Sequence, residues 1–244
     1  MDSQGAAPRL SPSTLRPSGA FETAMAVLSH IPGEAGWIGY RKLKRRIGNR
    51  TLADFRRIVD TLGPGDIAID LGANAGEITQ ELARSGAEVH AFEPDPETFA
   101  RLQGAVAGFD NVVLHNKAAG GEAGLVPILR PASWYEGREP SASKAVSVVR
   151  DQRTEGFVPA GSVEIIDFAA FLNALPRPAT LVKVDIEGSE WALLDRVMAE
   201  ARDQFDAMFV ETHERFDRSV LPRLKAMQCE FAAWDRPYVN LYWG

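Results

Sequence analysis

Carboxylates and a histidine follow two apolar segments in the second half of the sequence. Asp185 closes the segment 180–185 and Glu187 follows it, while His213 comes directly after the segment 207–212. If both segments are strands of one parallel sheet, these side chains meet at the sheet edge where open α/β folds bind ligands. A histidine or a carboxylate at such an edge can take a proton from a hydroxyl group. We therefore expect a proton-transfer site, with His213 or Asp185 as the base.

Two further charged residues belong to the same stretch. Lys183 lies inside a strand that should be covered on both faces, so its ammonium group needs a partner. Lys183 either forms a structural ion pair or, together with Glu187, orients the acceptor. Glu190 falls in the first turn of the following helix, where the helix dipole favours an acid. Its presence therefore needs no functional explanation.

A divalent cation is the alternative use of this cluster. Hard carboxylate oxygens suit Mg²⁺, and the residues that could hold it are Asp185, Glu187, Glu211 and His213. No spacing between them requires a metal, so we predict none.

A second constellation occupies residues 67–93, which read as a strand, a glycine turn, a helix and a second strand. Gly72 and Gly76 bracket the turn, and Glu93 ends the second strand 21 residues after Gly72. An acid at that offset in a βαβ unit is placed to accept hydrogen bonds from ribose hydroxyls. The first half of the chain is therefore predicted to bind a ribose-containing ligand.

The turn itself selects among ribose ligands. A dinucleotide fingerprint starting at Gly72 would need glycines where the chain has Asn74 and Glu77, which argues against an NAD-linked oxidoreductase. Asp70 and Glu77 would also repel a pyrophosphate but suit a cationic sulfonium and ammonium. S-Adenosylmethionine is therefore the predicted cofactor. The residues expected to bind it are Asp70, Gly72, Ala73, Asn74, Gly76, Glu93, Pro94, Asn116 and Asp185, with Asn116 placed to contact the adenine.

Composition narrows the class of protein. The 244 residues suit one α/β domain. A net charge of −6 argues against a nucleic-acid or anionic-membrane partner, so we predict no nucleic acid. Cys229, the single cysteine, excludes an intrachain disulfide and a cysteine-based metal site. Because there is neither an apolar membrane span nor a signal peptide, we expect a cytoplasmic protein. The oligomeric state is left open.

The N-terminal quarter is predicted to contain a flexible arm and a helical segment. Residues 1–20 read as a flexible arm and residues 21–62 as a helical segment, in which Thr51 begins the last helix. The basic stretch 37–47 reads as a solvated helix face, with a patch for an acidic substrate as the alternative. Residues 63–244 then form the catalytic domain.

An insertion at about 120–166 interrupts the alternation of strands and helices. We expect strands at 126–129, 145–149 and 163–166. The loop at 130–145 carries Trp134, Tyr135 and Arg138, which either form a platform over the substrate or belong to a mobile flap. At the C-terminus, 230–234 and 238–243 read as an antiparallel β-hairpin.

Three motifs together resemble the FkbM-type S-adenosylmethionine-dependent methyltransferases over roughly residues 50–243. They are D-L-G-A-N-A-G at 70–76, F-E-P-D at 92–95 and V-K-V-D-I-E-G-S-E at 182–190. The resemblance implies a Rossmann-like, seven-stranded, mostly parallel sheet with helices on both faces and an antiparallel last strand. It also implies methyl transfer to a hydroxyl of a sugar, glycolipid, polyketide or similar small-molecule or saccharide acceptor. A non-catalytic nucleoside-binding module on the same fold is the alternative.

Overall fold

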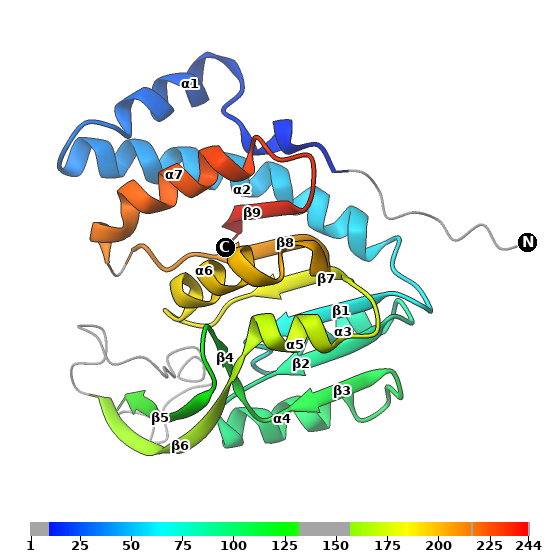
Figure 1. The fold of residues 1–244 in the computed structure, drawn as a ribbon. Coiled ribbons are helices and arrows are strands. Elements are labelled where there is room, and N and C mark those ends of the chain that lie inside the picture. The colour runs from blue at the N-terminus through cyan, green and yellow to red at the C-terminus, as the bar shows by residue number, and fades with distance from the viewer. Residues whose placement is uncertain (1–9, 132–156, 216, 244) are drawn as a thin grey trace, which may run out of the picture.

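The computed structural model describes residues 10–131, 157–215 and 217–243 of the chain. Its centre is a six-stranded sheet in the order β3-β2-β1-β7-β8-β9, in which every neighbouring pair is parallel (Figure 1). The strands are β1 (Ile67–Leu71), β2 (Glu88–Phe92), β3 (Val112–His115), β7 (Ala179–Val184), β8 (Phe205–Glu211) and β9 (Tyr238–Trp243). The strand order reverses beside β1, so the ligand crevice of this fold lies between β1 and β7.

Helices cover both faces of the sheet, because alternate strand residues point to opposite sides. Ile67 and Ile69 pack with α5 (Phe168–Ala174), α6 (Glu190–Glu200) and α7 (Leu221–Phe231). Ala68, on the other face, packs with α2 (Glu34–Val59) and α3 (Glu77–Ala83). The helix α4 (Pro96–Val106) covers β2 through Leu102. The predicted Rossmann-like α/β sheet is thus confirmed.

The predicted C-terminal hairpin and its antiparallel strand are wrong. Glu230 and Phe231 belong to α7, and β9 pairs with β8 in parallel. Leu224 and Phe231 are buried one heptad apart on the same face of α7, which is a helical rather than a strand pattern. A parallel neighbour needs a crossover connection, and α7 supplies it. The described central sheet accordingly has six strands rather than the expected seven.

The helical segment also differs from its prediction. After α1 (Gly19–Leu28), α2 runs without a break for 26 residues, so Thr51 lies in its interior and begins no new helix. The Thr51 hydroxyl donates to the carbonyl oxygen of Gly48 at 3.1 Å instead of capping free amides. The buried stripe of Ile47, Thr51 and Phe55 continues through the expected break, which keeps the helix whole.

Part of the expected arm is packed on the domain. The short 3₁₀ helix η1 (Pro12–Leu15) buries Leu15, and Arg16 donates to the carbonyl oxygen of Ala232 at 2.9 Å. Residues 10–18 therefore differ from the flexible arm that their composition predicts. Two further 3₁₀ turns, η5 (Arg202–Gln204) and η6 (Arg218–Val220), flank β8.

A second sheet of three strands stands beside the first. It contains β4 (Ala118–Gly120), β5 (Gly124–Pro131) and β6 (Phe157–Asp167) in the order β4-β6-β5. The expected strand at 145–149 and the platform of Trp134, Tyr135 and Arg138 lie outside the described residues. The domain boundaries stay a prediction. None of the helices that the structure describes has the length and apolar character that a membrane-crossing segment requires.

Candidate active site

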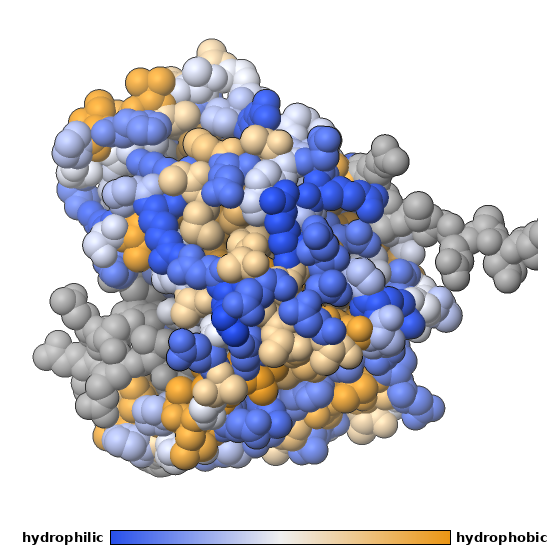
Figure 2. All heavy atoms as spheres, in the orientation of Figure 1, coloured by the Kyte–Doolittle hydropathy of each residue, from blue (hydrophilic) through white to orange (hydrophobic). Residues whose placement is uncertain are grey.

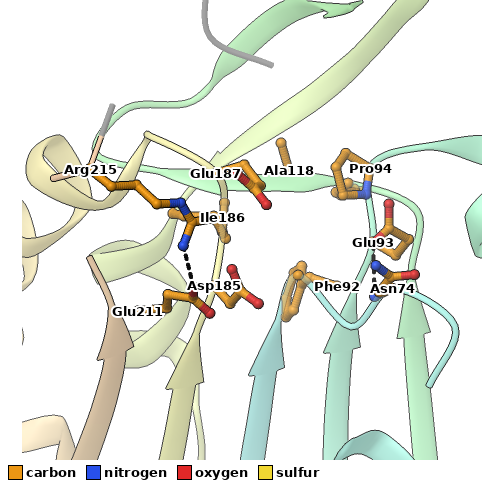
Figure 3. A pocket seen from close by; sticks show the side chains of 13 residues that line it. Asn74, Phe92, Glu93, Pro94, Ala118, Asp185, Ile186, Glu187, Glu211 and Arg215 are labelled. Carbon is orange, nitrogen blue, oxygen red and sulfur yellow. Dashed lines mark hydrogen bonds and ion pairs between the residues drawn. The ribbon is translucent and has the colours of Figure 1, made fainter. Parts of the chain in front are cut away.

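A cavity of about 310 Å³ opens at the carboxyl ends of the central strands, on both sides of the β1–β7 reversal (Figure 3). Its volume is at the lower end of the range for cofactor and substrate pockets. Its lining residues are Gly72, Asn74, Phe92, Glu93, Pro94, Lys117, Ala118, Ala119, Asp185, Ile186, Glu187, Glu211 and Arg215. In Figure 3, Glu93 and Asn74 lie toward one end of the cavity and Glu211 and Arg215 toward the other, with Asp185 between them.

The glycine turn after β1 joins the two halves of this cavity. Gly72 has a φ of +75°, and a Cβ built on it would lie 1.7 Å from the carbonyl oxygen of Asp185. The amide of Asp185 in turn donates to the carbonyl oxygen of Leu71 at 3.0 Å. Only glycine fits a position that combines a left-handed backbone with so close an approach. The turn thus places the end of β1 directly against the end of β7.

Glu93 occupies the position that its spacing predicts. Its carboxylate accepts the amide hydrogens of Asn74 and Asp95, each at 2.9 Å, and it is 7% exposed at the cavity wall. Burial raises the pKa of Glu93 to about 7, although the two amide hydrogen bonds work in the opposite direction. Each carboxylate oxygen has a second lone pair, so Glu93 can still accept a hydroxyl hydrogen from a ligand.

Asp70 and Lys183 form a buried ion pair beneath the turn. The Lys183 ammonium lies 3.0 Å from the Asp70 carboxylate and donates to the carbonyl oxygen of Gly72 at 2.8 Å. Thr79 donates to the same carboxylate at 2.7 Å. Burial alone would lower the pKa of Lys183, but the charges of Asp70 and Asp185 outweigh it and raise that pKa. Neither Asp70 nor Lys183 lines the cavity, and both hold the turn. The predicted contacts of Asp70 with the cofactor and of Lys183 with the acceptor stay predictions.

Three other predicted cofactor residues support the wall without lining it. The Asn116 amide donates to the carbonyl oxygens of Glu93 and Pro94, at 2.9 and 3.1 Å. Ala73 is buried, and Gly76 begins α3 with a φ of +92°. Asn116 thus braces the loop that follows β2, and its expected contact with an adenine stays a prediction.

Acidic groups and His213 form the other half of the site. His213 Nε2 lies 3.3 Å from Glu187, 3.6 Å from Asp185 and 3.9 Å from Glu211. Its Nδ1 lies 2.7 Å from the buried carboxylate of Glu190. The imidazole, 5% exposed, does not itself line the cavity, whereas the three carboxylates facing Nε2 do. His213 is therefore placed behind the carboxylates rather than in front of them.

The charges and the burial of this cluster shift the pKa values of its members. Burial would lower the pKa of His213, but the hydrogen bond and charge of Glu190, together with Glu187 and Asp185, outweigh it and raise that pKa. Burial raises the pKa of Asp185 and also that of Glu187, against the opposing charge of His213 and, for Asp185, of Lys183. The positive imidazolium thus helps to keep two crowded carboxylates ionised.

Comparison with protein families identifies the chain. The family model described as a methyltransferase FkbM domain matches residues 70–230, which include both halves of the cavity. This chain belongs to the FkbM methyltransferase family. Its members are S-adenosylmethionine-dependent methyltransferases, as the three sequence motifs predict.

Curated relatives match a shorter part of this FkbM-family chain. It is 40% identical over 78 residues to ribosomal RNA small subunit methyltransferase A of Thermotoga petrophila, covering 30% of each protein. The corresponding protein of Moorella thermoacetica is 47% identical over 53 residues, which are 22% of this chain and 18% of that protein. The chain thus spans less than a third of the length of these relatives. The prediction that excluded nucleic acid as a partner is wrong, because it is contradicted by these RNA-methylating relatives.

Solved structures are similar to this FkbM-family chain only at low identity. An FkbM methyltransferase from Methylobacillus flagellatus is 15% identical, with a TM-score of 0.39, over 73% of this chain and 44% of that one. An rRNA methylase from Streptococcus thermophilus is 11% identical, with a TM-score of 0.38, over 68% of this chain and 73% of that one.

Two residues of this FkbM-family site were not assigned a role from the sequence. Glu190 holds His213 but is 23 positions away from it, so no local spacing connects them. Arg215 lines the cavity and lies 3.3 Å from Glu211. Its position two residues after His213 is the one signal that could have indicated it.

The cluster also has the composition of a cation site. Ligand atoms of Asp185, Glu211 and His213 all lie within 4.8 Å of one another. Carboxylate and imidazole donors suit a divalent cation. A cation held there would compete with the imidazolium charge of His213, and the prediction of no metal stays a prediction.

Proposed function

We propose that this chain binds S-adenosylmethionine in the cavity at the strand ends and transfers its methyl group to a hydroxyl oxygen. The observation that carries the proposal is the presence of Glu93 and Asp185 in one cavity. Glu93 is an acceptor for ribose hydroxyls at the end of β2. Asp185 is a carboxylate with a raised pKa at the end of β7. A group that binds the ribose of the cofactor and a group that accepts a proton, on either side of a glycine turn, suit methyl transfer from S-adenosylmethionine to a hydroxyl.

The residues of the cavity fit this cofactor. Glu93 accepts from the ribose, and Asn74 and Pro94 line the wall beside it. Asp185 and Glu187 place negative charge where a sulfonium and an ammonium would lie. When bound, S-adenosylmethionine supplies a methyl group on a positively charged sulfur that departs as a neutral thioether. The same pocket residues would repel a pyrophosphate, so they do not favour NAD.

Asp185 is the proposed base. It lines the cavity, so it can reach an acceptor hydroxyl directly, whereas His213 lies behind it. Asp185 would accept the hydroxyl proton as the hydroxyl oxygen takes the methyl group that bound S-adenosylmethionine would supply. Glu187 accepts a hydrogen bond from the acceptor and orients it. His213, held by Glu190, keeps both carboxylates ionised before the reaction.

The acceptor is a hydroxyl of a sugar, glycolipid, polyketide or similar metabolite. RNA is a second candidate, favoured by the 40% identity to ribosomal RNA methyltransferases over 78 residues. A cation is not part of the proposed mechanism, so methyl transfer should persist in EDTA.

The test has a binding arm and a transfer arm. Calorimetric titration of the full chain should detect S-adenosylmethionine and S-adenosylhomocysteine and no binding of NAD. Methyl-labelled cofactor is then incubated with free sugars, glycolipids, polyketide alcohols and ribosomal RNA. With the acceptor that takes up label, Asp185→Asn should lower turnover at saturating S-adenosylmethionine by about 10²–10⁴-fold, beyond the weaker cofactor binding that loss of this charge also causes.

The matched control is Asp110→Asn, which changes an exposed aspartate in the same way. It should keep wild-type turnover. Binding of NAD in place of S-adenosylmethionine would overturn the proposed cofactor, and wild-type turnover of Asp185→Asn would remove Asp185 as the base. Label on a nitrogen or carbon atom of the product would overturn the assignment to a hydroxyl.

A further inference from the structure

The two N-terminal helices form a hairpin that exposes apolar side chains. We use the name α1–α2 hairpin for residues 19–46, which contain α1, its connection and the first half of α2. Eight large apolar side chains are exposed in the described parts of the chain, and four of them lie in this hairpin. They are Phe21, Val27, Ile31 and Ile38, exposed by 47%, 67%, 51% and 48%. Such a concentration on one element indicates a contact surface.

Cations of α2 lie beside two of these apolar groups, Ile38 and Phe21. Relative to Ile38, the residues Arg41, Lys42, Arg45 and Arg46 stand at i+3, i+4, i+7 and i+8, which is one face of a helix. All four are exposed. Phe21, Lys42, Arg45 and Arg46 surround a shallow hollow of about 260 Å³. Figure 2 shows hydrophobic surface over α1 beside strongly hydrophilic surface.

In the part of the chain that the structure describes, these cations have no carboxylate partner. Among residues 10–131, 157–215 and 217–243, no carboxylate forms an ion pair with Arg41, Lys42, Arg45 or Arg46. The two acids of the hairpin are held by other partners, since Glu22 pairs with Arg50 and Glu34 pairs with Arg218. Arg41 and Arg46 contact the rings of Trp37 and Phe21, which leaves their charge available.

The net charge of the whole chain does not reveal this local excess of positive charge. The chain carries −6, but α2 alone holds eight of its 27 Lys and Arg residues and only two carboxylates. Electrostatic attraction to a charged surface is screened over about 10 Å at moderate salt, so a partner senses the nearby face rather than the total charge.

We propose that the α1–α2 hairpin docks this protein on an anionic membrane surface. Aliphatic side chains next to arginines and lysines are the combination that binds the boundary between lipid headgroups and acyl chains. Val27, Ile31 and Ile38 enter the acyl region, while the cations reach the anionic headgroups. Three aliphatic groups and one aromatic ring favour lipid over RNA, because base stacking needs aromatic platforms.

The docking surface faces the same way as the catalytic edge. Figure 1 shows the connection between α1 and α2 on the side toward which the parallel strands point. Lys44 of α2 contacts Thr212 and Glu214, which flank His213, so the hairpin and the catalytic loop are directly joined. A docked hairpin therefore turns the cavity toward the bilayer. This second step rests on the proposed function and makes a lipid-linked hydroxyl the favoured acceptor.

Vesicle co-sedimentation of the full chain tests the docking without S-adenosylmethionine. The protein should sediment with phosphatidylcholine vesicles that contain phosphatidylglycerol, far less with phosphatidylcholine alone, and less as salt is added. Arg45→Glu should weaken binding by about tenfold or more, and Ile31→Ser should weaken it severalfold. The matched controls are Arg56→Glu, an exposed arginine near the other end of α2, and Leu125→Ser on β5, 74% exposed. Both controls should bind like the wild type.

Three outcomes would overturn the docking proposal. The first is that the protein sediments with neither kind of vesicle. The second is that Arg45→Glu and Arg56→Glu weaken vesicle binding equally. The third is that the protein binds single-stranded RNA but no vesicles, and that Arg45→Glu abolishes the RNA binding. Calorimetric titration of S-adenosylmethionine into the same variants keeps the two proposals separate. The variants should bind the cofactor normally, so loss of vesicle binding with intact cofactor binding concerns the hairpin alone.

Discussion

Glu190 Oε1 lies 2.7 Å from His213 Nδ1, in a contact that is buried on both sides. The ring is therefore oriented by a residue that never reaches the cavity. Its other nitrogen, Nε2, faces the carboxylates of Asp185 and Glu187, and it carries positive charge to them when the ring is protonated. The charge state of His213 thus links a buried helix start to the reactive edge of the sheet.

Glu190→Gln should lower the pKa of His213. The substitution keeps a hydrogen-bond acceptor but removes the charge that, with this hydrogen bond, opposes the effect of burial. Titration of the histidine ring signals by NMR should show His213 above its ordinary value of 6.5 in the wild type and displaced downward in the variant. The internal reference is His115, whose pKa burial and the neighbouring His90 lower to about 4, and which should not move. An unchanged His213 titration would contradict the role of Glu190.

The stability of the fold should depend on pH through His213. Folding raises the pKa of His213, so the folded state holds the proton more tightly than the unfolded chain. This stabilisation is complete below the unfolded pKa of about 6.5 and disappears as the pH rises through the folded pKa. His213→Gln should therefore flatten the loss of unfolding free energy toward alkaline pH in urea titrations. His115→Gln should change the unfolding free energy only at acidic pH, because the pKa of His115 is lowered.

Local spacing accounts for what the sequence predicted well. Gly72 and Glu93 belong to one βαβ unit, so their separation along the chain determines their separation in space, and both line the cavity. Asp185 and Glu187 follow directly from the end of β7 and also line it. The parallel core followed from short apolar strands alternating with helices. These inferences needed only neighbours within one supersecondary unit.

Features that depend on distant contacts were not predictable. The partner of His213 comes from another element, and the Asn116 side chain donates to the backbone carbonyl oxygens of Glu93 and Pro94. Thr51 has the residue type of a helix cap, but packing of the continuous buried stripe kept α2 intact. The turn-like residues 235–237 predict a hairpin with a strand at 230–234, but Phe231 pairs at heptad spacing with Leu224 on the buried face of α7. In each case tertiary packing outweighed a local preference.

Cofactor affinity should weaken below neutral pH. The pKa of Glu93 is about 7 in the free protein, and a ribose hydroxyl donates a stronger hydrogen bond to its ionised form than to its protonated form. Binding therefore lowers this pKa, and the affinity falls by up to about tenfold per pH unit as the pH drops below 7. Glu93→Gln should bind S-adenosylmethionine weakly and lose this pH dependence in calorimetric titrations. Glu122→Gln, at an exposed glutamate away from the cavity, should keep it.

Replacing Asp70 should lower the stability of the fold more than it lowers the affinity for the cofactor. Asp70→Asn removes the nearer counter-ion of the buried Lys183 ammonium and leaves the carboxylate of Asp185 at 3.7 Å, which should cost up to about 3–5 kcal/mol of unfolding free energy. Lys183→Met should cost a similar amount. The double variant should lose much less than the sum, because no unpaired charge remains. Urea unfolding followed by circular dichroism measures all three, and strictly additive losses would show that the pair is not coupled.

Gly72 should tolerate no side chain. In Gly72→Ala the new Cβ would stand 1.7 Å from the carbonyl oxygen of Asp185, at a backbone φ of +75° that disfavours alanine. Because that oxygen belongs to the backbone, relief requires β1 and β7 to separate at the cavity. We expect a large loss of stability and, in whatever protein folds, at least a tenfold loss of cofactor affinity, since displacing reactive groups by about 1 Å is costly. Gly104→Ala is the matched control, because α4 leaves open space there and alanine favours a helix. That variant should be as stable as the wild type or more so, and equal behaviour of the two substitutions in thermal unfolding would refute the proposed contact between the strand ends.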